Sequence, residues 1–544
     1  MIHRLLVVGL LFASWASLQA QEVRVLHITI TVPDADGRDR PVPRHALLVS
    51  DNPPTGAPRR VVTSLEGTVD VRLRPGNYTI ESDDPLIYQG RSYSWMQILD
   101  VPAGRDSTLA LTAANAQVAE SSSSATMAAG QSSPSELLMT WQGNVVTLWS
   151  DTARGAGFVL DRRGLILTNA HVAGASETVE VQFSATRKIA GRVLVADRAK
   201  HVAVILIDPS LVSALPPAKL GYKEGAPALA EQQDIFSIDA SLPDQKTLVS
   251  GRVERINGAV FETDLHIDDR ATGVPILTAT GAIIGITSGE DRDQGDAVRI
   301  DLAATVIAAA EEKMEKLAAA TAPKTTTLPV EPKPPATDSW KDAAPKRIAN
   351  LGPYQFSTSD FDVTLITPLL NHVLHTRPDY TTGASTPGGK QDLSDIDPAR
   401  RSLEDFGNWK DYVDGIPPVL IVRATPKLKE KFWTTVGRMA ASTQGMALPP
   451  FKKMQDSFAS MRLYCGQSEI TPIHPFRIER RLDNDNGLFE GLYVFDPASI
   501  GSPCKEPVKL VLFSEKSPAK GDERVIDPKM LDQVAKDFAI TGIK

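Results

Sequence analysis

Cysteine is almost absent from this chain: its 544 residues include only two, Cys465 and Cys504. So low a count excludes a Cys-x-x-Cys redox centre and a zinc site built from several thiolates. In an oxidising compartment, an even pair of cysteines is most simply one disulfide. We therefore expect Cys465 and Cys504 to be bonded to each other, with two buried free thiols as the alternative.

The chain also lacks a positive net charge and a long apolar run beyond its N-terminus. Its formal net charge is -8, which gives no electrostatic reason to expect a nucleic acid or an anionic membrane as a partner. No later segment reaches the roughly 18 consecutive apolar residues that indicate a membrane-spanning helix. The sequence therefore predicts no nucleic-acid binding and no stable membrane insertion of the mature protein.

The first twenty residues, MIHRLLVVGLLFASWASLQA, have the pattern of a secretory signal peptide. His3 and Arg4 precede a short apolar run from Leu5 to Ala13, and small residues follow that run. A retained N-terminal anchor is the alternative. We expect residues 1–20 to be removed and the mature protein to be secreted or periplasmic.

Two segments lack apolar periodicity and divide the rest of the chain into three folded units. Residues 113–135 are rich in Ala and Ser, and residues 318–345 are rich in Pro, Ala and Thr, so both are predicted to be linkers. Because proline recurs throughout the second linker, we expect it to be extended and to hold its flanking domains apart. The predicted folded units are residues 22–112, 136–317 and 346–544.

The first unit alternates polar and apolar residues in short runs separated by turn residues, which predicts a small β-sandwich. Its stretch VTSLEGTVDVRLRPGNYTI, residues 62–80, resembles the carboxypeptidase-regulatory-like domains. The resemblance depends on a turn glycine and an L-x-P-G-x-Y corner, here Gly67, Leu73, Pro75, Gly76 and Tyr78. It implies an accessory or adhesive module rather than a catalyst.

The third unit is predicted to be an α+β domain. A helix is expected over Pro426–Ser442, and runs such as PVLIVRA, GLYVFDP and KLVLFS are typical of strands. His372 and His375 lie one helical turn apart, but no third ligand is placed near them, so no metal site is predicted. This unit contains no glycine-rich phosphate loop, and we expect no cofactor.

The middle unit consists of strand-like runs followed by an alanine-rich helix. GAGFVLDRRGLILTNAHVAG, Gly155–Gly174, places two apolar strands around a charged turn and ends in a T-N-A-H-V corner. ADRAKHVAVILID, Ala196–Asp208, leads into a buried strand. The later segment Val249–Gly289 contains DDRATGVPIL, which separates two further apolar runs.

In content and order, these motifs resemble the trypsin-like serine peptidases of the bacterial HtrA (Do/Deg) type. The resemblance implies a chymotrypsin-like double β-barrel, and it makes His171 the catalytic histidine of the T-N-x-H-V motif. The position of the triad aspartate falls on His201, and that of the nucleophilic serine on Thr272. The glycine of the oxyanion hole, two residues before the nucleophile, falls on Arg270.

These replacements remove the chemistry that the resemblance would imply. An imidazole at position 201 cannot offset the charge of a protonated His171, and amide replacement of the aspartate in this template already costs roughly 10⁴-fold in kcat. The added methyl group of Thr272 restricts its side-chain rotamers, and an internal threonine lacks the N-terminal amine that activates known threonine nucleophiles. Arg270 restricts a backbone turn that glycine permits, and losing one oxyanion donor costs about 10² to 10³ in rate.

We therefore expect an exported multidomain protein with an inactive peptidase domain, a pseudo-peptidase that binds a peptide or protein partner. One alternative is an active endopeptidase with His171 as the base and Thr272 or Ser288 as the nucleophile. Asp197 would orient His171 only if its strand slipped in register. The other alternative is a structural or adhesive envelope protein in which the barrel is a spacer. No feature of the sequence sets the oligomeric state.

Overall fold

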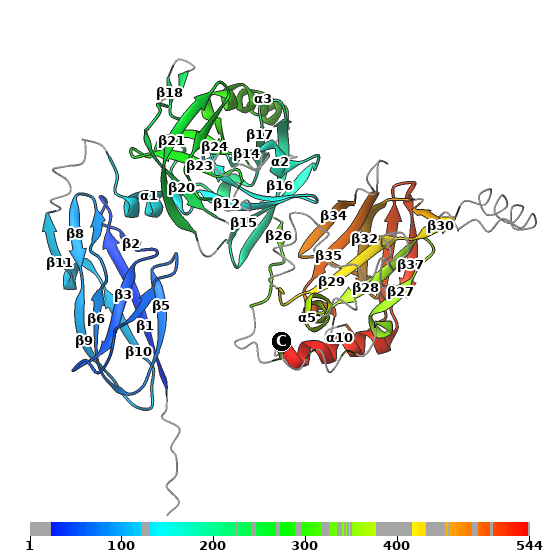
Figure 1. Cartoon of the computed structure of the whole chain (residues 1–544), viewed down its shortest axis with the longest axis horizontal. Coiled ribbons are helices and arrows are strands. Elements are labelled where there is room, and N and C mark those ends of the chain that lie inside the picture. Colours follow the sequence, from blue (N-terminus) through cyan, green and yellow to red (C-terminus); the bar gives the residue numbers. More distant parts are fainter. Residues whose placement is uncertain are drawn as a thin grey trace, which may run out of the picture. The chain divides into compact units, whose positions relative to one another are not determined.

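The computed structural model divides the chain into two compact units, residues 1–139 and 140–544, which are described separately (Figure 1). The predicted signal peptide lies outside the described residues. No helix among the described residues is long and apolar enough to cross a membrane. The structure describes residues 23–541 except 121–130, 224–225, 228, 241–242, 244–245, 268–271, 289–295, 318–325, 334–339, 342–343, 345–347, 349–350, 377–415, 431–451, 455, 481–487 and 501–503.

Unit 1 is a β-sandwich, as the alternating pattern predicted. One sheet contains β1 (Arg24–Pro33), β2 (Asp39–Pro41), β5 (Thr68–Leu73) and β10 (Ser107–Leu111). The other has the order β4-β3-β6-β9, with β3 (Ala46–Asp51), β4 (Arg59–Val62), β6 (Gly76–Ser82) and β9 (Met96–Val101). A small third sheet joins β7 (Leu86–Tyr88), β8 (Arg91–Ser94) and β11 (Gln117–Glu120), so the fold of this unit extends beyond residue 112.

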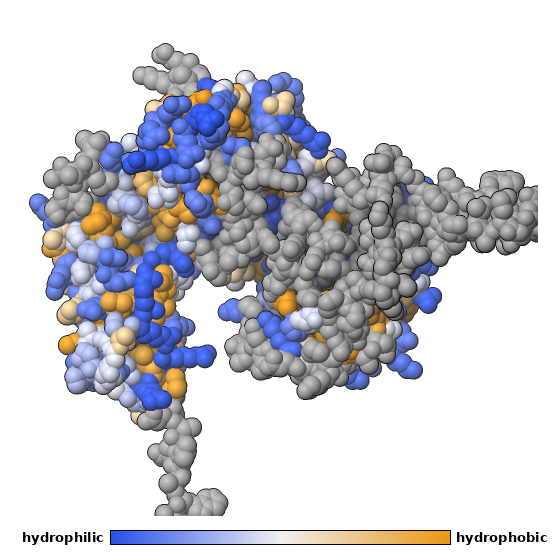
Figure 2. Space-filling view, viewed as in Figure 1, coloured by the Kyte–Doolittle hydropathy of each residue, from blue (hydrophilic) through white to orange (hydrophobic). Residues whose placement is uncertain are grey.

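The sandwich core follows from the period-two pattern of its strands. Alternate residues of β1, from Leu26 to Val32, are buried, whereas the residues between them face outward. Gly67 has φ +71°, and a Cβ at this position would lie 2.6 Å from the Ile30 carbonyl oxygen, so the turn requires glycine. The Tyr78 hydroxyl donates to the Arg74 carbonyl at 2.9 Å. On the visible surface, hydrophilic and hydrophobic residues are interspersed (Figure 2).

The first barrel of unit 2 consists of six strands in the order β15-β12-β13-β14-β17-β16, closed by pairing between β15 and β16. The side chains of β12, β13, β14 and β17 are almost all buried, as expected for strands that are covered on both faces. The elements are α1 (Pro134–Trp141), which spans the boundary between the units, β12 (Val145–Trp149), β13 (Arg154–Val159), β14 (Leu165–Asn169), α2 (Ala170–Ala173), β15 (Thr178–Ser184), β16 (Arg187–Asp197) and β17 (Val202–Leu206).

The second barrel is closed in the order β20-β21-β22-β25-β24-β23. Together, the two barrels confirm the predicted chymotrypsin-like architecture and the mainly β fold class. The elements are β18 (Tyr222–Lys223), β19 (Ala226–Pro227), β20 (Asp234–Asp239), β21 (Thr247–Asn257), β22 (Val260–Thr263), β23 (Pro275–Thr278), β24 (Ile283–Thr287), β25 (Ala297–Arg299) and α3 (Ala303–Lys316).

The C-terminal part of unit 2 combines two sheets with helices, as the α+β prediction stated. One sheet has the order β27-β28-β29-β35-β34, the other β33-β32-β36-β37, and β30 pairs with β31. The elements are β26 (Thr327–Leu328), β27 (Gln355–Ser357), β28 (Phe361–Ile366), α5 (Pro368–Thr376), β29 (Leu420–Pro426), β30 (Leu428–Glu430), β31 (Lys452–Met454), β32 (Phe458–Cys465), β33 (Ser468–Ile470), β34 (His474–Arg480), β35 (Leu488–Phe495), α9 (Pro497–Ile500), β36 (Val508–Ser514), β37 (Ser517–Val525) and α10 (Pro528–Thr541).

Two sequence predictions for this region have different outcomes. The disulfide between Cys465 and Cys504 is confirmed, with Cα atoms 5.7 Å apart. The helix predicted to begin at Pro426 is wrong at its start, because residues 428–430 form β30, which pairs with β31. Residues 431–442 of that predicted helix lie outside the described part of the chain.

The Pro-rich segment does not hold the barrel and the C-terminal sheets apart, so that expectation is wrong. β26, within this segment, pairs with Lys188 and Ile189 of β16 and adds a strand to the first barrel. Trp149 of β12 belongs to the same apolar cluster as Ile473 and Phe476 of the C-terminal part. Burying these side chains against one another favours contact between the two domains over an extended spacer.

Candidate functional site

His171 lies on α2, the one-turn helix that directly follows β14. Asn169 caps this helix, because its side-chain oxygen accepts a hydrogen bond from the His171 backbone N–H at 2.8 Å. The neighbours Ala170 and Val172 are buried, whereas His171 is exposed. The local sequence therefore anchors the helix in the first barrel and leaves the imidazole at the surface.

His201 lies in the turn between β16 and β17, with a left-handed backbone at φ +56°. Its carbonyl oxygen accepts a hydrogen bond from the Ala170 N–H at 3.1 Å, so the turn is fixed directly beside His171. Asp197 accepts a hydrogen bond from the Lys200 N–H at 3.1 Å, and its other oxygen lies 3.5 Å from the Lys200 ammonium. Asp197 of β16 pairs with Val202 of β17, so β16 has not slipped in register. The Asp197 carboxylate therefore contacts Lys200 within the turn.

The loop that carries Thr272 is fixed to both barrels. The Thr272 carbonyl accepts from Ala156 N–H of β13 at 2.7 Å, and the Gly273 N–H donates to the Thr287 hydroxyl oxygen at 2.9 Å. Gly273 has φ +96°, and a Cβ there would collide with the Ala156 carbonyl oxygen. Thr272 itself is only 6% exposed, which leaves its side chain little access to a substrate.

The fold therefore brings positions 171, 201 and 272 together through their backbones. Gly155 lies between α2 and the loop that carries Thr272. A Cβ at this position would collide with Val172 of α2 and would lie 2.7 Å from the Thr272 carbonyl oxygen. Arg270, the residue at the predicted oxyanion-hole position, lies outside the described residues. These backbone contacts place the turn that carries His201 beside α2 and the loop that carries Thr272 beside β13.

Comparison with known proteins identifies this domain. The family model described as a trypsin-like peptidase domain matches residues 155–286. The putative serine protease HhoA of Synechocystis sp. is 32% identical over 170 residues, which are 28% of this chain and 42% of HhoA. A probable periplasmic serine endoprotease DegP-like of Halomonas elongata is 28% identical over 142 residues, or 25% of this chain and 29% of that protein. The chain thus spans less than half the length of these relatives.

Two solved structures show a partial likeness. The serine endoprotease from Yersinia pestis has 21% sequence identity and a TM-score of 0.29, and the match covers 34% of this chain and 67% of that one. Deg5 has 26% identity and a TM-score of 0.26, with coverage of 32% and 90%. On the family match and the sequence relatives, the central domain is a trypsin-like peptidase domain of the HtrA/Do type, as the motifs predicted.

A second polar cluster, which the sequence did not indicate, lies between the first barrel and β34. The His474 ring is fully buried, with Nδ1 2.7 Å from a Glu180 oxygen of β15 and Nε2 2.6 Å from a Glu331 oxygen of the Pro-rich segment. The fully buried Lys188 ammonium donates to the Ile473 carbonyl at 2.6 Å and lies 3.3 Å from the same Glu180 oxygen.

The charges of this cluster lower the pKa of Glu331. Burial raises the pKa of the Glu331 carboxyl, but the charge of His474, its hydrogen bond and the charge of Lys188 outweigh burial and lower the pKa to about 2. The Glu331 carboxylate is therefore ionised throughout the neutral and mildly acidic range.

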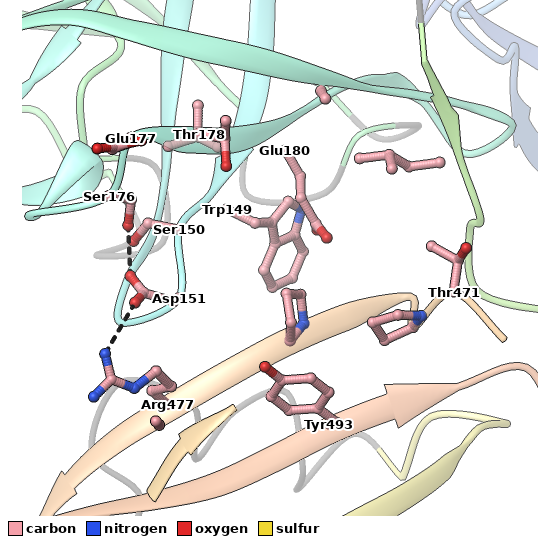
Figure 3. Close-up of a pocket in the computed structure, with 16 residues that line it drawn as sticks. Trp149, Ser150, Asp151, Ser176, Glu177, Thr178, Glu180, Thr471, Arg477 and Tyr493 are labelled. Carbon is pink, nitrogen blue, oxygen red and sulfur yellow. Dashed lines mark hydrogen bonds and ion pairs between the residues drawn. The ribbon is translucent and has the colours of Figure 1, made fainter. Parts of the chain in front are cut away.

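A cavity of about 460 Å³ lies beside this cluster (Figure 3). Figure 3 shows the Glu180 carboxylate next to the Trp149 ring, with Tyr493 on the opposite wall. Its walls come from β12, β15, β16, β26 and the C-terminal strands, and the lining residues include Ser150, Asp151, Thr178, Pro472, Pro475 and Arg477.

None of the described residues forms a group of three or more His, Cys, Asp or Glu side chains placed to hold a metal ion. His372 lies on α5, with its ring 5.8 Å from the Trp340 ring in an edge-to-face contact. The side chain of His375 lies outside the described part. His372 therefore contributes to packing between α5 and the preceding segment.

Proposed function

We propose that the central domain is a pseudo-peptidase, which does not cleave peptides and whose cleft binds a peptide or protein partner. The proposal rests on the motif spacing that assigns His201 to the position of the triad carboxylate, and it is supported by the hydrogen bond from the Ala170 N–H, next to His171, to the His201 carbonyl oxygen. An imidazole there cannot stabilise a protonated His171, as the triad template requires. The loss of that carboxylate by itself corresponds to roughly 5.5 kcal/mol of barrier.

The geometry around the other two positions supports the same proposal. Asp197, the nearest acid in the sequence, is engaged with Lys200 in its own turn and does not replace the missing carboxylate. Thr272 keeps a hydroxyl, but the residue is 6% exposed. Gly155 and Gly273 keep the backbone contacts that shape the site. A fold that keeps its backbone framework while its reactive groups are replaced is suited to binding rather than to turnover.

Export is part of the proposal. The N-terminal sequence has the pattern of a signal peptide, and relatives from Halomonas and Pseudomonas are named as probable periplasmic endoproteases. We therefore infer that this chain acts outside the cytoplasm, in the periplasm or beyond. The single disulfide agrees with an oxidising compartment.

Restoring the replaced groups tests the loss of activity. The triple variant His201→Asp, Arg270→Gly, Thr272→Ser is compared with the wild type by casein hydrolysis and by labelling with a fluorophosphonate. We expect labelling of the triple variant and none of the wild type. Labelling or hydrolysis by the wild type that disappears in His171→Ala would instead support the active endopeptidase.

Binding is tested separately, with fluorescently labelled unfolded casein followed by anisotropy. His171→Trp places a bulky ring at an exposed position of the proposed binding site, and His27→Trp is a control at an exposed histidine of unit 1. We expect His171→Trp alone to weaken binding. Binding that both variants retain would favour the structural or adhesive alternative, in which the barrel is a spacer.

A further inference from the structure

We propose that His474 is the centre of a pH-sensitive latch: its imidazolium holds the C-terminal domain on the first barrel and on the Pro-rich segment, and deprotonation loosens this interface. The proposal does not depend on the activity of the peptidase site. It is based on one buried ring that joins three segments far apart in the sequence, since Glu180 and Glu331 lie 294 and 143 residues from His474.

The contacts of the ring require two protons. An ionised carboxylate only accepts hydrogen bonds, and a neutral imidazole donates from one nitrogen only. With Glu180 at 2.7 Å from Nδ1 and Glu331 at 2.6 Å from Nε2, both contacts are satisfied only when His474 is an imidazolium. A neutral ring would place a lone pair against one of the two carboxylates.

The charges around the ring balance only in the protonated state. Lys188 on β16 and a charged His474 on β34 offset Glu180 on β15 and Glu331 on the Pro-rich segment. Loss of the His474 proton leaves one uncompensated negative charge in a site where the ring and Lys188 are fully buried. Such a charge is costly because Glu180 and Glu331 are only 13% and 22% exposed, so water solvates their carboxylates only in part.

The other groups that pack against the ring do not replace this charge. The rings of Trp149 on β12 and Phe476 on β34 lie 4.2 and 4.9 Å from the His474 ring and shield it. The Arg154 guanidinium lies over the Trp149 ring at 4.4 Å. The neighbouring Arg477 contacts Glu515 at 2.7 Å and Asp151 at 3.9 Å, so its charge is already paired.

The latch lies at the interface between the first barrel and the C-terminal domain. β34 is the edge strand of its sheet, and its free edge faces the barrel: the Arg477 N–H donates to the Asp151 carbonyl at 2.7 Å. Ile473 and Phe476, on either side of His474, belong to the apolar cluster that includes Trp149. Loosening the latch therefore exposes an unpaired strand edge and apolar side chains.

Hydrogen exchange of the full-length protein tests this proposal. The protection of peptides from β34 and β15 is measured between pH 5.5 and 9 and corrected for the intrinsic pH dependence of exchange. We expect the wild-type protection of both peptides to fall by about tenfold or more as the pH rises. A change of this factor corresponds to the loss of one hydrogen bond to a charged group.

Three variants separate the latch from general effects of pH. His474→Phe keeps an aromatic ring against Trp149 and Phe476 but cannot be charged, so its protection should be lower and independent of pH. Glu331→Gln, at a position that is 22% exposed, keeps the shape and should lower protection on the acidic side of the range. The control His27→Phe removes an exposed histidine 2.7 Å from Asp70 and should leave the wild-type curve unchanged.

Wild-type protection that does not change with pH would overturn the proposal. An equal change in His27→Phe and His474→Phe would also overturn it, because the effect would then not arise at this interface. If His474→Phe does not fold, Glu331→Gln decides alone: protection equal to that of the wild type at pH 5.5 contradicts the latch. The activity of the peptidase site does not enter any of these readouts.

Discussion

Lowering the pH from 8 to 4 is expected to destabilise the N-terminal sandwich through a single buried histidine, His45. This residue is 9% exposed, its ring meets the Trp95 ring edge to face at 5.5 Å, and its Nε2 lies 3.2 Å from the Ser82 hydroxyl oxygen. Burial lowers the pKa of His45 to about 4, although the charges of Asp84 and Asp83 act in the opposite direction. The folded sandwich therefore resists protonation of this ring.

The size of the effect follows from the difference between the folded and unfolded states. Above the ordinary pKa of 6.5, His45 is neutral in both states and costs nothing. As the pH falls from 6.5 towards 4, the unfolded chain binds a proton that the folded sandwich excludes, so stability decreases. The full difference corresponds to about 3 kcal/mol of unfolding free energy, reached near pH 4.

Hydrogen exchange in peptides from β3 and β6 measures this loss of stability within the full chain, after correction for intrinsic exchange rates. His45→Gln cannot titrate and should remove most of the slope between pH 6.5 and 4, whereas the exposed control His27→Gln should keep it. An identical pH dependence in the wild type and His45→Gln would refute the reasoning. The sandwich and the His474 latch should respond to acid in opposite ways, since one excludes a proton and the other requires it.

Two further predictions concern stability. Replacing Cys465 and Cys504 with serine should lower the unfolding free energy by on the order of 4 kcal/mol in the chain-entropy model, because the bond closes a loop with a sequence separation of 39. Denaturant titration measures this loss of stability. Adding a reductant should lower the stability of the wild type and leave that of the serine variant unchanged. Gly273→Ala should lower stability far more than Gly258→Ala, because both have positive φ but only Gly273 would place a Cβ against the Ala156 carbonyl; equal thermal midpoints would contradict this.

The central domain was predictable because its signals are local. The strands on either side of the turn before Leu165 and the T-N-A-H-V corner at His171 are read from contiguous residues, and β14 and α2 form where the motif places them. Cys465 and Cys504 were also predictable, because an even pair leaves few alternatives. The assignment of His201 to the triad carboxylate depends on the spacing of a motif that ends in the buried strand β17, and it stays a prediction.

Other features depend on contacts between distant residues. Pro426 was placed at the start of a helix, but it ends a strand that pairs with β28, and residues 428–430 pair with β31. Tertiary pairing overrode the local helical pattern there. The cluster of His474 with Glu180 and Glu331 is invisible in the sequence, because no motif links residues 294 and 143 positions apart. The spacer role expected of the Pro-rich segment failed for the same reason.

Hydrolysis of unfolded casein by the purified wild-type protein, measured beside His171→Ala, tests the central claim most directly. With an imidazole at position 201 and Thr272 only 6% exposed, we predict that the two proteins give the same background rate. Cleavage by the wild type that is abolished in His171→Ala would contradict the claim that this peptidase domain binds without cutting.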